Sequence, residues 1–236
     1  MKTVVEVMKE LEKNGSEQTR KTFARHGAPS DMFGVKVADL KVIAKKIKGN
    51  QQLAMELFDT GNSDAMYLAG LVADGSKMSR KQLDAWAKGA SWSAISEYTV
   101  PWNAAENSGG WAVGLKWIES KKESIASCGW ATLSSILAIR PDGELDLKQI
   151  QALMDRAAKE VHSAPNRVRS AMNGFVIAVG AYVKPLLVKA KATAKKIGVV
   201  DVDMGDTACK VPVALPYIEK IESMGRVGKK RMTTKC

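Results

Sequence analysis

The apolar residues of this chain recur at helical spacing in most of its segments. Residues 37–50 carry one apolar stripe with lysines on the opposite side, and the stripe consists of Val37, Leu40, Ile43, Ala44 and Ile47. Side chains three and four positions apart share a face of an α-helix, so the pattern predicts amphipathic helices. The segments with this spacing are 4–13, 16–27, 37–50, 51–61, 63–75, 78–90, 110–121, 123–140, 146–163, 164–183 and 184–198.

Polar caps and glycines mark the ends of several predicted helices. Ser16, Ser63 and Ser79 each precede such a segment and are expected N-caps, because a serine hydroxyl can accept from a free N–H of the first turn. Gly27 and Gly49 are expected at helix ends. Strand signals are nearly absent, and only residues 198–203 (GVVDVD) alternate weakly, which predicts an extended segment. We therefore expect an all-α fold.

The helices show a loose internal repeat. Residues 57–70 and 117–130 both read as an apolar helix end, a polar turn, a capping serine and a second apolar helix. Degenerate helix pairs of this kind are typical of superhelical HEAT-like or armadillo α-α solenoids. No low-complexity linker divides the chain. We expect residues 1–236 to form a single helical-repeat domain, with a short basic C-terminal tail at about 226–236.

The charge of the chain points to a polyanionic partner. The net charge is +11, and the residues from Lys184 onward hold twelve Lys/Arg against five Asp/Glu. Such an excess favours DNA, RNA or an anionic membrane surface as the partner. The alternative for the tail is a disordered, solubilising end.

Several classes of protein are excluded or disfavoured. There is no run of eighteen apolar residues, as a membrane span needs, and the first residues lack the apolar block of a signal peptide, so a cytoplasmic protein with no membrane partner is expected. Cys128, Cys209 and Cys236 are scattered and only two histidines are present, so we expect neither a disulfide framework nor a metal site. No phosphate-binding glycine loop occurs, and no cofactor is expected.

Three segments resemble the bacterial DNA alkylation repair (AlkD-like) family. They are HGAPSDMFGVKVADLKVIAKKIK (26–48), GNSDAMYLAGLVAD (61–74) and ASWSAISEY (90–98), and the similarity spans most of residues 20–180. The resemblance implies a superhelix of HEAT-like repeats whose basic concave face holds duplex DNA. Active members of the family hydrolyse the glycosidic bond of positively charged alkylated purines.

The resemblance also places the catalytic position. Trp92 matches the family's tryptophan, but Ser96 stands where active members carry an aspartate four residues later, and Ser93 replaces a common acidic residue. A serine supplies no negative charge to an oxocarbenium-like centre, so that stabilisation is lost. Glu97 is adjacent, yet one step along a regular helix turns a side chain by about 100°. Glu97 is thus a catalytic candidate only if the helix rotates or bulges.

Two further family motifs lack their arginines. The Trp-x-Arg-Arg helix falls on SCGWATLSS, which keeps Trp130, and a later helix falls on SAMNGFVIAVG, where Asn173 stands. Trp92 is either a wall against a nucleotide or a core residue, and the same alternatives hold for Trp130. Asn173 either faces the groove or bonds a neighbouring helix in the core.

Each group of basic candidates also has two possible roles. Lys45 and Lys46 form either a phosphate-contacting stripe or an ordinary solvated face. Arg167 and Arg169 lie at a helix start, where the dipole does not favour cations, so a phosphate or carboxylate partner is considered. Binding through such cations would be salt-sensitive and independent of sequence. The full set of DNA-binding candidates is Trp92, Trp130, Lys45, Lys46, Arg167, Arg169, Asn173, Lys229, Lys230 and Arg231.

We expect a DNA-binding protein of the alkylation-repair superfamily. It would hold duplex or distorted DNA in a basic concave groove, mainly through the phosphate backbone, with inefficient hydrolysis of alkylated purines. One alternative is an active DNA glycosylase for N3- or N7-alkylated purines with a rearranged site. The other is a non-enzymatic helical-repeat scaffold for protein partners.

Overall fold

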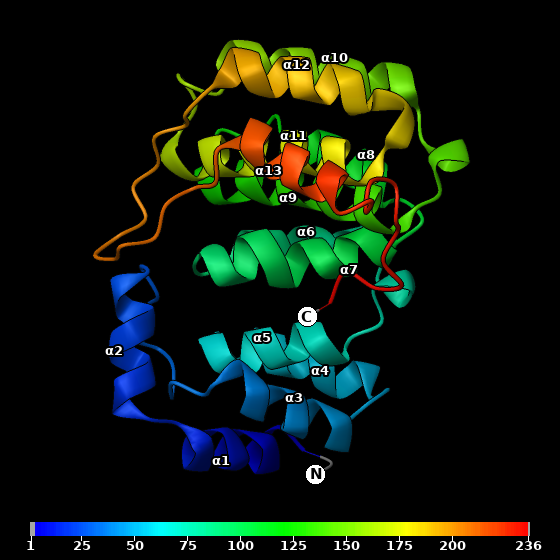
Figure 1. Cartoon of the computed structure of the whole chain (residues 1–236). Coiled ribbons are helices and arrows are strands. Elements are labelled where there is room, and N and C mark those ends of the chain that lie inside the picture. The colour runs from blue at the N-terminus through cyan, green and yellow to red at the C-terminus, as the bar shows by residue number, and fades with distance from the viewer. Residues whose placement is uncertain (1–2, 236) are drawn as a thin grey trace. The chain divides into compact units, whose positions relative to one another are not determined.

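A computed structural model describes residues 3–235 of the chain (Figure 1). These residues form thirteen α-helices, three short 3₁₀ turns and one π-helix. The described part contains no β-strand, only an isolated bridge between Gly15 and Val35. Residues 198–203 lie in neither helix nor strand. The all-α prediction is therefore confirmed.

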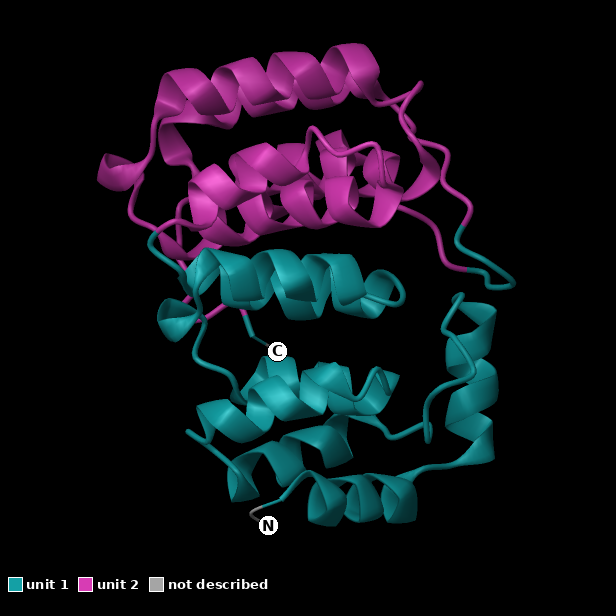
Figure 2. Ribbon diagram, turned by 180° about the vertical axis from the view of Figure 1, so that it is seen from behind, with its two compact units in different colours: residues 1–108, 204–208, 235–236 teal, residues 109–203, 209–234 magenta. Residues whose placement is uncertain are grey.

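The chain divides into two compact units, coloured separately in Figure 2. Unit 1 contains residues 1–108, 204–208 and 235–236, and unit 2 contains residues 109–203 and 209–234. The expectation that residues 1–236 form one domain stays a prediction.

Unit 1 is built around helix α5. Eight of the ten α5 residues are buried, and α5 contacts α1, α3, α4 and α7. Trp86 of α6 stacks on Phe58 of α4 with ring centroids 4.1 Å apart. The elements of this unit are α1 (Val4–Asn14), α2 (Glu17–Arg25), α3 (Val37–Lys46), α4 (Gln51–Asp59), α5 (Ser63–Val72), η1 (Gly75–Lys77), α6 (Arg80–Gly89), the π-helix η2 (Ile95–Thr99) and α7 (Val100–Glu106).

Several helices begin at a residue whose side chain caps the first turn. Ser16 and Ser79 accept from the third N–H of α2 and α6, so both predicted caps are confirmed. The predicted cap Ser63 is wrong by one residue. Asn62 caps α5 instead, because its longer side chain reaches the N–H groups of Asp64 and Ala65 at 3.1 and 3.2 Å.

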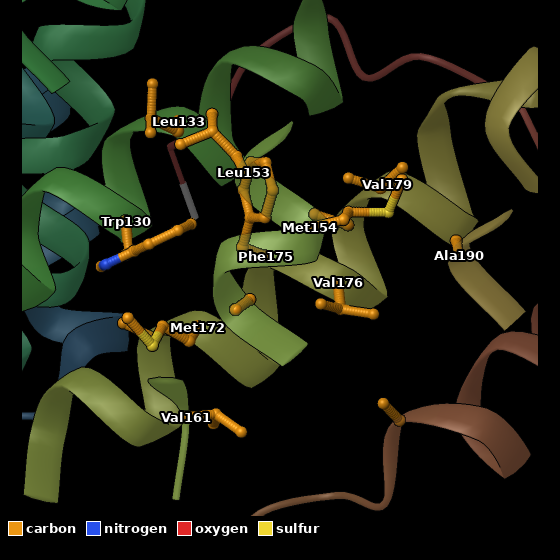
Figure 3. Packing of buried hydrophobic residues seen from close by; sticks show 14 of the residues in the cluster. Trp130, Leu133, Leu153, Met154, Val161, Met172, Phe175, Val176, Val179 and Ala190 are labelled. Carbon is orange, nitrogen blue, oxygen red and sulfur yellow. The ribbon is translucent and has the colours of Figure 1, made fainter. Parts of the chain in front are cut away.

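Unit 2 is centred on two 17-residue helices, α9 and α11, which pack against each other. Figure 3 shows their core, in which the Trp130 and Phe175 rings meet edge to face at 5.2 Å. The elements are α8 (Gly110–Trp117), α9 (Glu123–Ile139), η3 (Asp142–Glu144), α10 (Leu147–Glu160), α11 (Asn166–Tyr182), η4 (Lys184–Leu186), α12 (Leu187–Ile197) and α13 (Ala214–Ser223).

The basic C-terminal segment packs on unit 2. The N–H groups of Gly228 and Arg231 donate to carbonyl groups of α11 and α9 at 2.9 and 2.7 Å. Lys230 Nζ donates to a carbonyl of α9 at 3.0 Å and pairs with Asp142 at 2.8 Å. Residues 228–231 are thus hydrogen-bonded to helices, unlike a disordered tail.

The end of this segment joins unit 1. Lys235 Nζ forms an ion pair with Glu106 at 3.1 Å and also donates to the Ala73 carbonyl. Residue 236, the last of the predicted tail and its cysteine, lies outside the described residues.

Within residues 3–235, no single helix is both long enough and apolar enough to cross a membrane. Only α11 and the segment Lys184–Ile197 meet that test together, across a bend of 112°.

Candidate functional site

Trp92 lines a cavity of about 250 Å³ that lies wholly in unit 1. Its walls come from α2, the start of α3, α5 and the segment around the π-helix η2. Apolar and aromatic side chains predominate. The lining residues are Phe23, Val35, Val37, Leu40, Ser63, Asp64, Tyr67, Trp92, Ala94 and Tyr98.

Four of the lining residues of the cavity are aromatic. Phe23 and Trp92 face each other with centroids 5.7 Å apart and planes inclined by 44°. Tyr67 and Tyr98 both pack edgewise on the buried Trp102, at 5.4 and 6.3 Å. Tyr98 is 52% exposed, so this side of the cavity reaches solvent.

Asp64 fixes the wall formed by residues 33–35. Its carboxylate is 4% exposed and accepts from the N–H groups of Phe33, Gly34 and Val35 at 2.6, 2.9 and 3.0 Å. Gly34 has φ +80°, and a Cβ there would lie 2.6 Å from the Ser16 carbonyl oxygen, so the tight approach requires glycine. Burial raises the pKa of the Asp64 carboxyl, and the three N–H bonds act in the opposite direction.

The segment after Trp92 forms a π-helix. The N–H of Val100 donates to the Ile95 carbonyl five residues earlier. Such a turn widens the helix, so successive side chains no longer follow the regular 100° step. The close approach of this segment to α5 depends on Gly70, where a Cβ would lie 2.3 Å from Thr99 Cγ2.

The π-helix brings Tyr98 to the cavity, while Ser96 and Glu97 are absent from its lining residues. Ser96 is 3% exposed, and Glu97 is half-buried. The helix therefore does bulge, as a role for Glu97 would require. A catalytic role for Glu97 stays a prediction.

Three exposed cations are close in sequence to lining residues of the cavity. Arg20 and Arg25 lie on either side of Phe23 in α2, and Lys36 lies between the lining residues Val35 and Val37. All three side chains are exposed, and none forms an ion pair with another described residue. Arg20 shares the face of α2 that carries Phe23, and its side chain passes Gly34.

The predicted cations of α3 differ from each other. Lys45 is exposed, whereas Lys46 pairs with Glu10 at 3.2 Å. The α3 candidates and Trp92 share unit 1, and the remaining binding candidates lie in unit 2.

Two candidates of unit 2 are core residues. Trp130 is fully buried against Phe175. Asn173 is 1% exposed, and its Nδ2 donates to the Pro212 carbonyl at 2.9 Å. The structure thus shows the core alternative for Trp130, whereas Asn173 is buried but bonds the segment before α13 and not a neighbouring helix.

The arginines at the start of α11 hold nearby backbone. The Arg169 guanidinium donates to the carbonyl groups of Ala164 and Asp201 at 2.9 and 3.0 Å. The Arg167 N–H donates to Glu123 at 2.6 Å, and the Arg167 side chain is half-buried. A carboxylate therefore does lie at this helix start, where it accepts from the backbone N–H of Arg167.

The cations of the tail differ in exposure and pairing. Lys229 and Arg231 are exposed, while Lys230 is held by Asp142, with 19% of its side chain exposed. The exposed pair is accessible to a polyanion, and Lys230 is already neutralised.

Sequence reasoning missed Phe23, Asp64, Tyr67 and Tyr98. A signal existed for Phe23, the one large apolar residue of the polar helix α2, and for Tyr98, a second aromatic residue six positions after Trp92. No local signal connects these residues, because their contacts are tertiary. Within residues 3–235, no three His, Cys, Asp or Glu side chains gather as a metal site would require.

Comparison with known proteins gives consistent matches. Residues 7–195 match the family model described as DNA alkylation repair enzyme. The chain is 36% identical over 217 residues to the uncharacterized protein Lin0241 of Listeria innocua and 35% identical to Lmo0209 of Listeria monocytogenes, covering 89% of this chain and 93% of each relative.

A solved structure matches with a TM-score of 0.91 and 38% identity, covering 99% of this chain and all of the other. It is described as "a new family of proteins related to the HEAT-like repeat DNA glycosylases with affinity for branched DNA structures". The HEAT-like fold prediction is confirmed by this match.

Proposed function

Because this chain belongs to the DNA alkylation repair enzyme family, we propose that it binds branched or otherwise distorted DNA and hydrolyses alkylated purines poorly. The observation that carries the proposal is the likeness to a structure with affinity for branched DNA, over nearly the whole chain and at 38% identity. The binding surface would comprise the exposed cations of each unit together with the cavity at Trp92.

The charge distribution supports binding through phosphates. The net charge of +11 includes exposed cations that no carboxylate neutralises, such as Arg20, Arg25 and Lys36 of unit 1. Lys45 on α3 and Lys229 in unit 2 are exposed in the same way. Each cation that meets a phosphate releases condensed counterions, so affinity would fall steeply as salt rises.

The chemistry at Trp92 supports poor hydrolysis. Among the described lining residues, Asp64 is the one carboxylate, and both of its oxygens already accept backbone N–H bonds. Ser96 is a neutral, buried hydroxyl. A cationic transition state at this cavity would therefore meet little free negative charge.

Fluorescence anisotropy on matched DNAs tests the binding proposal. A duplex, a three-way junction and a four-way junction of the same arm sequences are titrated with the full chain at about 50 and 200 mM salt. We expect tighter binding to both junctions than to the duplex, and weaker binding to all three at the higher salt. Equal affinity for junction and duplex, or affinity indifferent to salt, would contradict the proposal and favour the protein-scaffold alternative.

A base-release assay tests the catalytic part. Methylated duplex DNA is incubated with the chain and with a heat-inactivated control, and free 3- or 7-methylpurine is measured. We expect release at the control level. The enzyme alternative would instead give release that falls in Glu97→Gln but persists in Ser96→Ala, which would assign catalysis to the carboxylate on the π-helix.

A further inference from the structure

We infer that the cavity of unit 1 receives a single unpaired nucleobase from branched DNA. The inference rests on the proposed function and deepens it, because it assigns the part of the DNA that the cavity at Trp92 contacts. Phosphate contacts alone would explain affinity for any DNA, whereas a base site gives a reason to prefer DNA with unpaired positions.

The size and walls of the cavity suit one planar ring. A dry cavity of about 150 Å³ is enough to bind benzene, and this one measures about 250 Å³. Phe23 and Trp92 present their rings to it from two separate elements. Bases stack on such side chains whatever their sequence, because every base has a π-face.

The cavity offers one polar group to a base edge. Asp64 Oδ1 accepts one bond, from the Val35 N–H, and a carboxylate oxygen has room for a second. Every base edge carries at least one N–H donor, so any base can serve this oxygen. Trp92 Nε1 is buried, so the Trp92 ring would contribute stacking and not a hydrogen bond.

An exposed cation suits the phosphate of the nucleotide. Arg20 lies three residues before Phe23, on the same face of α2, and its side chain passes Gly34 in the wall formed by residues 33–35. A base in the cavity would therefore bring its own phosphate close to an exposed cation, without any need for the paired arms to enter.

Branch points are where such a base is available. A paired base must be unstacked and unpaired before it can leave the helix, at a cost of a few kcal/mol. For a base that is already unpaired, this free-energy cost is lowest. The cavity would thus select branched DNA by the ease with which one base leaves the stack.

The test compares two three-way junctions that differ at one position. One carries an unpaired adenine at the branch, the other an abasic nucleotide at the same place, and both are titrated by anisotropy with the full chain. We expect the adenine junction to bind about 5-fold to 100-fold more tightly, as one stacked base contributes. In Trp92→Ala this ratio should fall to about 1.

Tyr98→Ala is a second variant for the case in which Trp92→Ala fails to fold. Tyr98 lines the cavity yet is 52% exposed, so its truncation disturbs the core little, and the adenine preference should fall. Tyr217→Ala is the matched control, since Tyr217 is 47% exposed on α13 of unit 2, and it should keep the full preference. A 2-aminopurine at the unpaired position should change its fluorescence with the control variant and much less with Tyr98→Ala.

The outcomes separate the two proposals. If no junction binds better than duplex, the proposed function itself fails. If junctions bind better but adenine and abasic nucleotides bind equally, the base site is wrong and the proposed function stands. An adenine preference that survives both Trp92→Ala and Tyr98→Ala would place the base elsewhere and overturn the inference.

Discussion

Replacing Asp64 with alanine should destabilise unit 1 more than any surface substitution. The carboxylate accepts three backbone N–H bonds from residues 33–35, and those of Gly34 and Val35 are buried. Each buried donor left without a partner costs about 1–3 kcal/mol. Two such donors give a loss of about 2–6 kcal/mol, with the part-buried Phe33 N–H free to find water. Against a typical total of about 5–15 kcal/mol, this is a large fraction.

The graded variant is Asp64→Asn. Its amide oxygen can still accept one or two of the bonds, but its NH₂ group faces a backbone donor. We therefore expect a loss between those of wild type and Asp64→Ala. The matched control is Asp59→Ala, since Asp59 is exposed at the end of α4, and a change within about 0.5 kcal/mol is expected.

The assay is urea unfolding followed by far-UV circular dichroism, with hydrogen exchange by mass spectrometry to report each unit separately. Exchange is needed because two compact units need not unfold together. The amides of residues 33–35 should lose protection first in Asp64→Ala. A loss below about 1 kcal/mol, with protection of these amides unchanged, would refute the assignment of Asp64 as the anchor of this wall.

Three further substitutions have defined outcomes. Gly129→Ala puts a Cβ 2.6 Å from the Ile118 backbone N, so thermal unfolding should show a stability loss of about 1–3 kcal/mol. The control Gly174→Ala, whose Cβ would have no neighbour within 4 Å, should be neutral or stabilising. Equal effects of the two substitutions would refute the close approach of α8 and α9. Hydrogen bonds from the Ser76 hydroxyl and, to a smaller extent, from Lys77 lower the pKa of Asp74. Their contribution to stability is therefore present above the usual pKa of 3.8 and is lost as the pH falls through the lowered pKa. The loss of stability in Asp74→Ala, measured by unfolding curves, should be full at neutral pH and vanish in strong acid, and a loss that is constant with pH would contradict this. Lys36→Gln should reduce the slope of log affinity for junction DNA against log salt by about 0.9, and an unchanged slope would remove Lys36 from the interface.

Most of the helical fold could be predicted from the spacing of the apolar residues. The stripe from Val37 to Ile47 buries Leu40, Ile43 and Ile47, as the spacing required. The predicted caps lie within one residue of the observed ones. At α5, asparagine and serine are adjacent and both are good N-caps, and the structure has Asn62 as the cap and Ser63 as the first helical residue.

The site was less predictable, because it depends on contacts between distant segments. Phe23 and Trp92 are far apart in sequence, and helical spacing tells which face is apolar but not what it meets. A role for Glu97 required a rotated or bulged helix, and the sequence alone did not show that a π-helix forms there. Charge counting treated Lys229 and Lys230 alike, although only Lys230 pairs with Asp142.

The division of the chain also bears on synthesis. Unit 1 includes residues 204–208, which the ribosome makes after helices α8 to α12 of unit 2, and Lys235, which it makes after α13 as well. Gly205 fits against the Arg25 carbonyl, where a Cβ would lie 2.3 Å from the oxygen, and Lys235 neutralises Glu106. Domains usually fold from the N-terminus as they emerge. This N-terminal unit instead receives its last contacts only after residues 204–208 and Lys235 have been made, so a chain stalled before residue 204 would expose an incomplete unit 1 to proteases.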